Sequence, residues 1–168
     1  NQTKKLALLL PFNLTKVQND TVTKLVDRLK KDKFLNMTLD FYSGALMAID
    51  SAKQLGITVD VSVFDSEETK NNSTVANLIK QNKLDEFSAV IGPFYQTNVE
   101  KTAELLSANQ VAVISPLSKE VGKSYPNLFQ TITPNTIIRS AVFDFMRSKN
   151  GNMIAVVDKK KVSVKNIL

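Results

Sequence analysis

The sequence predicts a three-layer α/β/α fold of the flavodoxin-like type with a mostly parallel sheet. Short apolar runs alternate along the chain with segments of helical period, which is typical of buried parallel strands joined by helical crossovers. Two of these runs, at 88–91 and 111–114, share one design, because each is followed by a small residue and a proline. In an open α/β sheet the loops after the carboxyl ends of the strands form the ligand crevice, so these runs also predict a binding region.

The first half of the chain predicts a central strand and a long helix. The apolar run 5–12 is ended by Pro11 and reads as a buried strand. Residues 13–35 are polar and lysine-rich, and their apolar positions fit either a short surface helix at 22–29 or a mobile insertion. The strongest helix is expected at 36–55, with an inward stripe of Leu39, Tyr42, Ala45, Leu46, Ile49 and Ala52.

Two glycines mark this helix, and an alternating run comes after it. Gly44 inside the helix suggests close packing against a strand, and Gly56 is expected to end the helix as its C′ residue.

The alternating run 57–64 predicts an edge or near-edge strand. The acidic residues after it, Asp65, Glu67 and Glu68, are interpreted as a solvated strand-end loop in preference to a carboxylate cluster. Ser73 or Thr74 is expected to cap a helix that turns Val75, Leu78 and Ile79 inward.

The second half continues the alternation. A helix at about 98–109 separates the two opening strands, with Val99, Ala103, Leu105 and Leu106 as its apolar positions. Residues 126–134 predict a short extended segment, and Asn135 or Thr136 begins a helix carrying Ile138, Ala141, Val142, Phe145 and Met146. Residues 152–158 predict a further buried strand. The expected strand order is 2-1-3-4, with the switch point between strands 1 and 3.

Composition narrows the functional classes. The 168 residues contain no Cys and no His, which removes thiol nucleophiles, disulfides, His-based catalysis and the usual zinc sites, so neither a catalytic nor a metal-binding set is expected. The net charge of +6 comes partly from lysine runs that are interpreted as solvated surface, without a nucleic-acid motif. No apolar segment reaches the length of a membrane span. The abrupt start at Asn1 suggests that a native amino-terminal segment has been removed.

The candidate site residues come after the two opening strands. Gln96, Thr97 and Asn98 stand where a helix begins, so one of them, most plausibly Thr97 or Asn98, caps that helix. The same geometry also favours a ligand anion or carbonyl at the helix amino end, and both interpretations stay open. Tyr95 is expected either to stack on a ligand or to cover the strand end. Ser115 and Ser118 likewise have either a local structural role or a role in binding a ligand, and both interpretations stay open.

An ordered set of motifs resembles the type I periplasmic binding proteins, which include the branched-chain amino-acid receptors of ABC transporters. The set comprises Leu10-Pro11-Phe12, the helix 40–50, Val90-Ile91-Gly92-Pro93, Val113-Ile114-Ser115-Pro116 and Phe129-Gln130-Thr131-Ile132-Thr133-Pro134. The resemblance covers about residues 5–158. It implies a non-enzymatic, cofactor-free protein in which two lobes close on a small polar ligand such as an amino acid. Residues 1–133 would form the amino-terminal lobe, and 134–168 the crossover and the truncated start of the second lobe.

The resemblance also implies ligand-binding positions and a location. The ligand-binding positions would be Phe12, Tyr95, Gln96, Thr97, Ser115, Leu117, Ser118 and Lys119. Gln96 and Lys119 stand where amino-acid receptors usually have Ser or Thr. The protein is expected to be exported to the periplasm or cell envelope, with a lipid anchor as one option. A non-transport branch, in which the fold follows peptidoglycan-binding LysM repeats or stimulates peptidoglycan synthases, is the alternative. The strand 152–158 is expected either to pair with a second copy or to pack irregularly.

Overall fold

The computed structural model describes residues 3–18, 20–69, 73–149, 154, 156, 158 and 160. The chain divides into two compact units, residues 1–133 and residues 134–168, which are described separately. The first unit contains a parallel five-stranded sheet in the order β2-β1-β3-β4-β5. The predicted order of the first four strands is therefore confirmed, and the extended segment after Pro126 adds a fifth strand to the edge next to β4.

The two strands β1 and β2 have seven residues each, and the other three strands are shorter. Their bounds are β1 Lys4–Leu10, β2 Val59–Asp65, β3 Ala89–Ile91, β4 Ala112–Ser115 and β5 Leu128–Gln130. Leu8 of β1 pairs with Val63 of β2 on one side and with Ile91 of β3 on the other. The switch in strand order thus falls between β1 and β3, as the sequence predicts.

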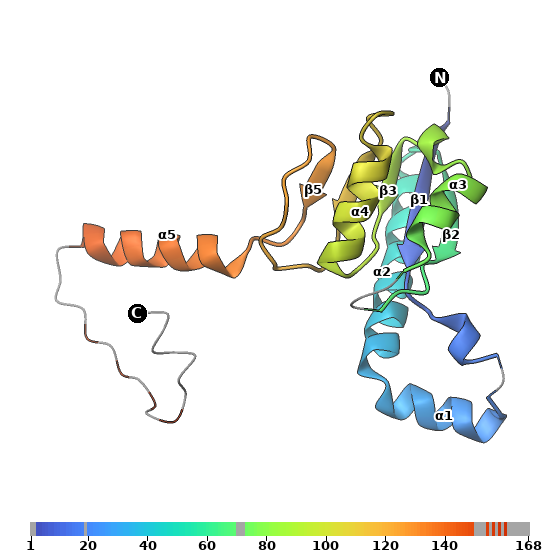
Figure 1. The fold of residues 1–168 in the computed structure, drawn as a ribbon, viewed down its shortest axis with the longest axis horizontal. Helices are drawn as coiled ribbons and strands as arrows, with labels where there is room; N and C mark the ends of the chain where they lie inside the picture. Colours follow the sequence, from blue (N-terminus) through green and yellow to red (C-terminus); the bar gives the residue numbers. More distant parts are fainter. Residues whose placement is uncertain are drawn as a thin grey trace. The chain divides into compact units, whose positions relative to one another are not determined.

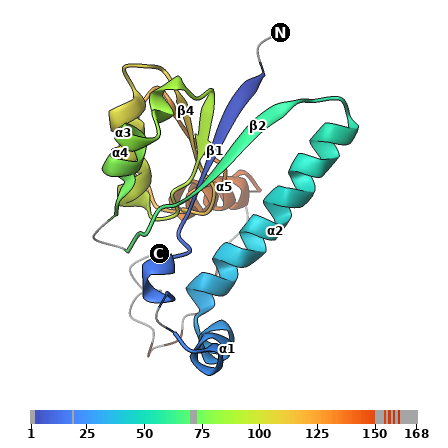
Figure 2. The same cartoon turned by 90° about the vertical axis from the view of Figure 1, so that its right-hand side faces the viewer.

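Helices cover both faces of this sheet (Figure 1). The helix α2, Lys33–Gln54, lies along one face, and the helices α3, Val75–Gln81, and α4, Gln96–Leu106, lie on the other (Figure 2). Successive residues of β1 therefore enter two different cores: Ala7 and Leu9 pack under α3 and α4, whereas Leu8 and Leu10 pack under α2. Burial on both faces explains why this strand reads as an unbroken apolar run.

A 3₁₀ turn and a helix precede α2. The turn is Leu14–Lys16 and the helix α1 is Val22–Lys31, so the surface helix expected at 22–29 is confirmed, whereas the mobility of this segment stays a prediction. The helix α2 begins three residues before the predicted start, because Asp32 Oδ1 accepts hydrogen bonds from Phe34 N at 3.1 Å and from Leu35 N at 3.0 Å. Gly56, with φ of 77°, follows the end of α2 as predicted.

Parts of the predictions for α2 and α4 are wrong. Leu39 and Leu46 of α2 are 37% and 43% exposed. Tyr42, Ala45 and Ile49 pack inward as predicted, and the helix completes its contact with Phe34, Leu35, Thr38 and Phe41. Gly44 has no atom within 4 Å of the position that a Cβ would take, so it is not a close-packing glycine. On α4, Leu105 is also exposed, whereas Val99, Ala103 and Leu106 are fully buried.

The second unit contains the helix α5, Asn135–Ser148, which starts where the sequence predicts. The predicted strand 152–158 falls mostly outside the described residues. Its three described members, Ile154, Val156 and Asp158, are exposed and carry no regular secondary structure, so a buried strand is wrong at those positions. Pairing of this segment with a second copy of the chain stays a prediction.

Candidate functional site

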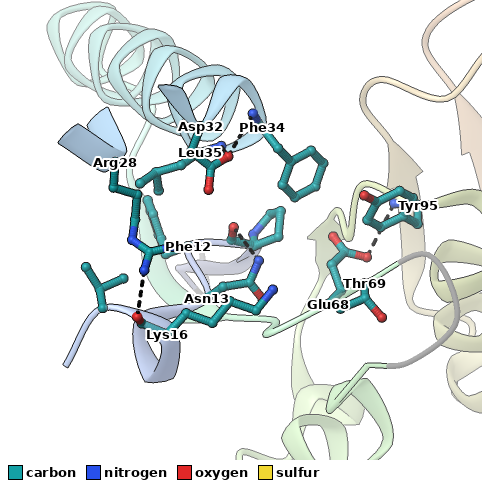
Figure 3. Close-up of a pocket in the computed structure, with 12 residues that line it drawn as sticks. Phe12, Asn13, Lys16, Arg28, Asp32, Phe34, Leu35, Glu68, Thr69 and Tyr95 are labelled. Atoms are coloured by element: carbon teal, nitrogen blue, oxygen red, sulfur yellow. Dashed lines mark hydrogen bonds between the residues drawn. The ribbon is translucent and has the colours of Figure 1, made fainter. Parts of the chain in front are cut away.

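The candidate site is a cavity of about 210 Å³ at the carboxyl ends of β1, β2 and β3. The segment after β1 contributes Phe12, Asn13 and Lys16 to its lining, and the junction between α1 and α2 contributes Arg28, Asp32 and Phe34. Glu68 and Thr69 follow β2, and Tyr95 follows β3 (Figure 3). The cavity therefore lies at the switch point of the sheet, where an open α/β sheet binds its ligands.

Aromatic rings form the wall of the cavity on the side of α2. Phe34 stacks on Tyr95 with ring centroids 5.2 Å apart and an angle of 20° between the rings. Phe94 lies beneath them and meets both Phe34 and Phe41 edge to face. Phe12 meets Tyr42 edge to face at 5.6 Å. These contacts fix the ring of Tyr95, which is also the N-cap residue of α4, beside the cavity.

The acidic loop after β2 is bonded to its neighbours rather than solvated, so that prediction is wrong. Asp65 accepts hydrogen bonds from Asn13 N at 2.9 Å and from Leu14 N at 2.7 Å, which ties the turn after β1 to the end of β2. Glu68 is only 1% exposed. Its carboxylate accepts hydrogen bonds from Phe94 N at 2.6 Å, Tyr95 N at 3.3 Å and the Asn98 side chain at 2.6 Å.

These hydrogen bonds determine the electrostatics of the site. Burial raises the pKa of Glu68 above its ordinary value, although the bonds from Asn98, Phe94 and Tyr95 favour the ionised form and oppose that rise. Burial also raises the pKa of the Tyr95 hydroxyl, and the charges of Glu68 and Asp32 add to the effect. Glu68 and Asp32 are therefore the two charged groups of the lining that act on the Tyr95 hydroxyl.

The two cations of the lining, Arg28 and Lys16, differ in their surroundings. Arg28 pairs with Asp20 at 2.8 Å and donates to the backbone oxygen of Lys16 at 3.1 Å, so its charge is already matched inside the protein. Lys16 itself is exposed. Among the described residues, no group of three or more acidic side chains is arranged to hold a metal ion.

The predicted site residues fall into two groups. Phe12 and Tyr95 line the cavity together. Gln96 and Ser118 are buried but lie outside the lining: Gln96 Nε2 donates to Glu100 Oε1, and Ser118 Oγ accepts from Glu120 N. Leu117 packs against the core beneath α2. Thr97 and Lys119 are exposed, and Ser115 is 1% exposed with no hydrogen-bond partner for its hydroxyl in the described part of the chain.

The capping interpretation of the α4 start is wrong. Tyr95 is the N-cap residue and makes no side-chain cap hydrogen bond. Asn98, which was a candidate cap, turns its amide toward Glu68 and the backbone oxygen of Thr69 instead. Glu68 and Asp32 were not predicted as site residues from the sequence. An acidic residue just after a strand was the only available signal, and such residues are usually solvated.

Taken together, the sheet order, the covering helices and the crevice at the switch point define an α/β lobe of the periplasmic-binding type. The chain belongs to the receptor family ligand binding region, whose pattern matches residues 43–164. No curated protein matches the sequence at a significant level. The resemblance to type I periplasmic binding proteins is thus confirmed at the level of family and fold.

Solved structures of low sequence identity share this fold. An ABC transporter substrate-binding protein from Desulfitobacterium hafniense is 14% identical with a TM-score of 0.58, over 99% of this chain and 46% of that one. The leucine binding protein LivK from Thermotoga maritima is 16% identical with a TM-score of 0.52, over 89% and 38%. LpoA from Haemophilus influenzae is 18% identical with a TM-score of 0.54, over 99% and 27%. The chain therefore spans less than half of each of these proteins.

Proposed function

We propose that this chain is one lobe of a receptor-type solute-binding protein that captures a small polar ligand, such as an amino acid, between two lobes. In this proposal residues 1–133 supply the first wall of the cleft, and residues 134–168 supply the crossover and the start of the second lobe. Family membership and the likeness to LivK, a leucine binding protein, support the proposal. The observation that carries it is the cavity at the switch point, which combines aromatic walls with a few polar groups.

The mechanism follows from the geometry of the cavity. A ligand placed against Phe12 and Tyr95 would bury apolar surface on their rings and direct its polar groups toward Asp32, Lys16 and the Tyr95 hydroxyl. Closure of the second lobe over it would exclude water and strengthen these polar contacts. The role is one of binding without catalysis, and it requires no cofactor.

The proposed location is outside the cytoplasm, in the periplasm or cell envelope, with lipid anchoring as a further part of the proposal. Family membership supports an extracytoplasmic role. Within the described residues, no helix has the length and apolar character needed to cross a membrane. The proposed partners are the ligand and a transport or envelope component, and nucleic acid is not among them.

Isothermal titration of the native protein with a panel of amino acids tests the proposal. A ligand from the panel is expected to bind and to raise the melting temperature. Tyr95→Phe removes one hydroxyl from the cavity lining and should weaken binding roughly three- to tenfold. Tyr125→Phe removes a hydroxyl from a ring that packs against the other core, and it should leave the affinity unchanged. Equal effects of the two variants, or no binding by any member of the panel, would contradict the proposal.

One observation favours a second candidate, an envelope interaction module that has lost small-ligand binding. The amino end of α4 is occupied by Glu68, so one polar loop of the predicted crevice is satisfied within the chain. LpoA, a structural neighbour, gives this reading weaker support through the fold alone. Co-sedimentation with purified peptidoglycan separates the candidates: binding to the cell wall, without a thermal response to any amino acid, would favour the interaction module.

A further inference from the structure

The carboxylate of Glu68 occupies the position where the amino end of α4 would receive a ligand anion. Two backbone N–H groups, of Phe94 and Tyr95, and one side-chain amide, of Asn98, all donate to it. Convergent donors at a helix amino end are the usual surroundings of a bound carboxylate or phosphate. Here the anion comes from the loop after β2, 26 residues before Phe94 in the sequence.

Hydrogen bonds of the neighbouring residues Ser66 and Asn98 hold the loop that carries Glu68 in place. Ser66 donates from its backbone N to Leu10 O at 3.0 Å, and its backbone oxygen accepts from the Thr74 hydroxyl at 3.0 Å. Asn98 holds Glu68 and the backbone oxygen of Thr69 with the same amide nitrogen. A ligand carboxylate brought to this helix end would find the donors taken and a like charge beside it.

The cavity next to Glu68 presents the opposite chemistry. Asp32 Oδ1 accepts the two capping hydrogen bonds of α2, and its Oδ2 has no hydrogen-bond partner among the described residues. The Tyr95 hydroxyl in the same lining also carries no hydrogen bond there, and it feels the charges of both Asp32 and Glu68.

The charge balance around the cavity also favours a cationic group. Arg28 is paired with Asp20, which lies outside the lining, so within the lining Lys16 remains opposite two carboxylates, those of Asp32 and Glu68. Aromatic faces at Phe34 and Tyr95 complete the surroundings that suit an ammonium group.

We propose that Glu68 takes the place of a ligand carboxylate on α4, and that the adjoining cavity therefore receives its ligand through a primary amine. The first half concerns the folded chain alone. The second half rests on the proposed ligand-binding function and names the ligand class. The two halves are tested separately, so that the failure of one is distinguishable from the failure of the other.

Chemical rescue of the native protein tests the first half. Glu68→Ala should lower the melting temperature by more than about 5 °C. Sodium formate, added at constant ionic strength, should restore part of this loss in a saturable manner, because it refills the vacated position. Sodium chloride should not, and the wild type should respond to neither salt. Formate that raises the melting temperature of Glu68→Ala no more than that of the wild type would overturn the proposal.

A second variant keeps the test decisive if Glu68→Ala does not fold. Glu68→Gln keeps the volume but has one acceptor oxygen in place of two, so its amide N–H₂ would face N–H donors that now bind the carboxylate, and its melting temperature should fall. Glu67→Gln makes the same chemical change at the neighbouring, half-buried residue and should leave the melting temperature nearly unchanged. Equal melting temperatures for the wild type and Glu68→Gln would overturn the proposal.

Three small probes test the second half by isothermal titration: leucine, leucinamide and 4-methylpentanoate. Leucinamide lacks the carboxylate and 4-methylpentanoate lacks the amine, whereas all three share the same hydrocarbon. Leucinamide should bind at least as tightly as leucine, and 4-methylpentanoate at least tenfold more weakly. Asp32→Asn should reduce this preference. Tighter binding of 4-methylpentanoate than of leucinamide would overturn the amine assignment, and so would absence of binding by all three, while the rescue result would stand.

Discussion

The ends of β3 and β4 share a sequence design but differ in chemistry. Ile91-Gly92-Pro93 and Ile114-Ser115-Pro116 occupy corresponding places after neighbouring parallel strands. After β3, the backbone N–H groups of Phe94 and Tyr95 bind a carboxylate from a distant loop. After β4, the Ser115 hydroxyl is buried and has no hydrogen-bond partner in the described part of the chain. A motif therefore locates a strand end, while groups from elsewhere in the fold decide which chemistry that end can bind.

The largest expected effect tests why one strand end has glycine and the other serine. Gly92 has φ of 96°, and a Cβ there would overlap the backbone oxygen of Leu9 in the neighbouring β1. Gly92→Ala should therefore lower the free energy of unfolding by about 3 kcal/mol or more, measured by urea denaturation.

Gly44→Ala is the matched control for this substitution. The added methyl group meets open space in the middle of a helix, so this variant should be stabilised by up to about 1 kcal/mol. Similar losses of stability in the two variants would show that the close approach of Gly92 to β1 is not the reason for a glycine there.

A smaller effect is expected in the pH dependence of stability, because the carboxylate of Glu68 is bound at the end of β3 and, among the described residues, no such group is bound at the end of β4. Because burial raises the pKa of Glu68 in the folded state, the folded protein binds its proton more readily than the unfolded chain does. The stability due to this shift is fully present below the ordinary carboxyl pKa and is lost as pH rises through the raised value. The free energy of unfolding of the wild type, relative to Glu68→Gln, should therefore fall as pH rises from about 4 upward. Parallel pH profiles of the two proteins would contradict this origin.

The smallest effect is expected at the end of β4. Ser115→Ala removes a buried hydroxyl that has no partner in the described part of the chain, so the change in unfolding free energy should stay within about 1 kcal/mol and can be stabilising. Ser118→Ala provides a comparison, because the Ser118 hydroxyl accepts a hydrogen bond from Glu120 N at 3.2 Å. A loss at Ser115 larger than that at Ser118 would indicate that the Ser115 hydroxyl binds an ordered water molecule.

The sequence alone determined the order of the first four strands of the sheet. Apolar runs set by burial on both faces, helix periods between them, and a glycine after α2 are local signals, so β1 to β4 and Gly56 were predictable. The exposed sides of Leu39 and Leu46 were not predictable, because Phe34 and Phe41 pack on Phe94 from another element and fix the rotation of α2.

The candidate site was the less predictable part, and only the tertiary structure decided it. Phe12 and Tyr95 come directly after strand ends, whereas Asp32 and Glu68 become site residues through their surroundings. Glu68 lies 30 residues from Asn98, and only the parallel pairing of β2, β1 and β3 brings the loops after these strands together. A carboxylate in a loop is normally best solvated by water; here convergent N–H donors and burial replace that water. Such a replacement depends on groups far apart in the chain, and no local pattern of residues encodes it.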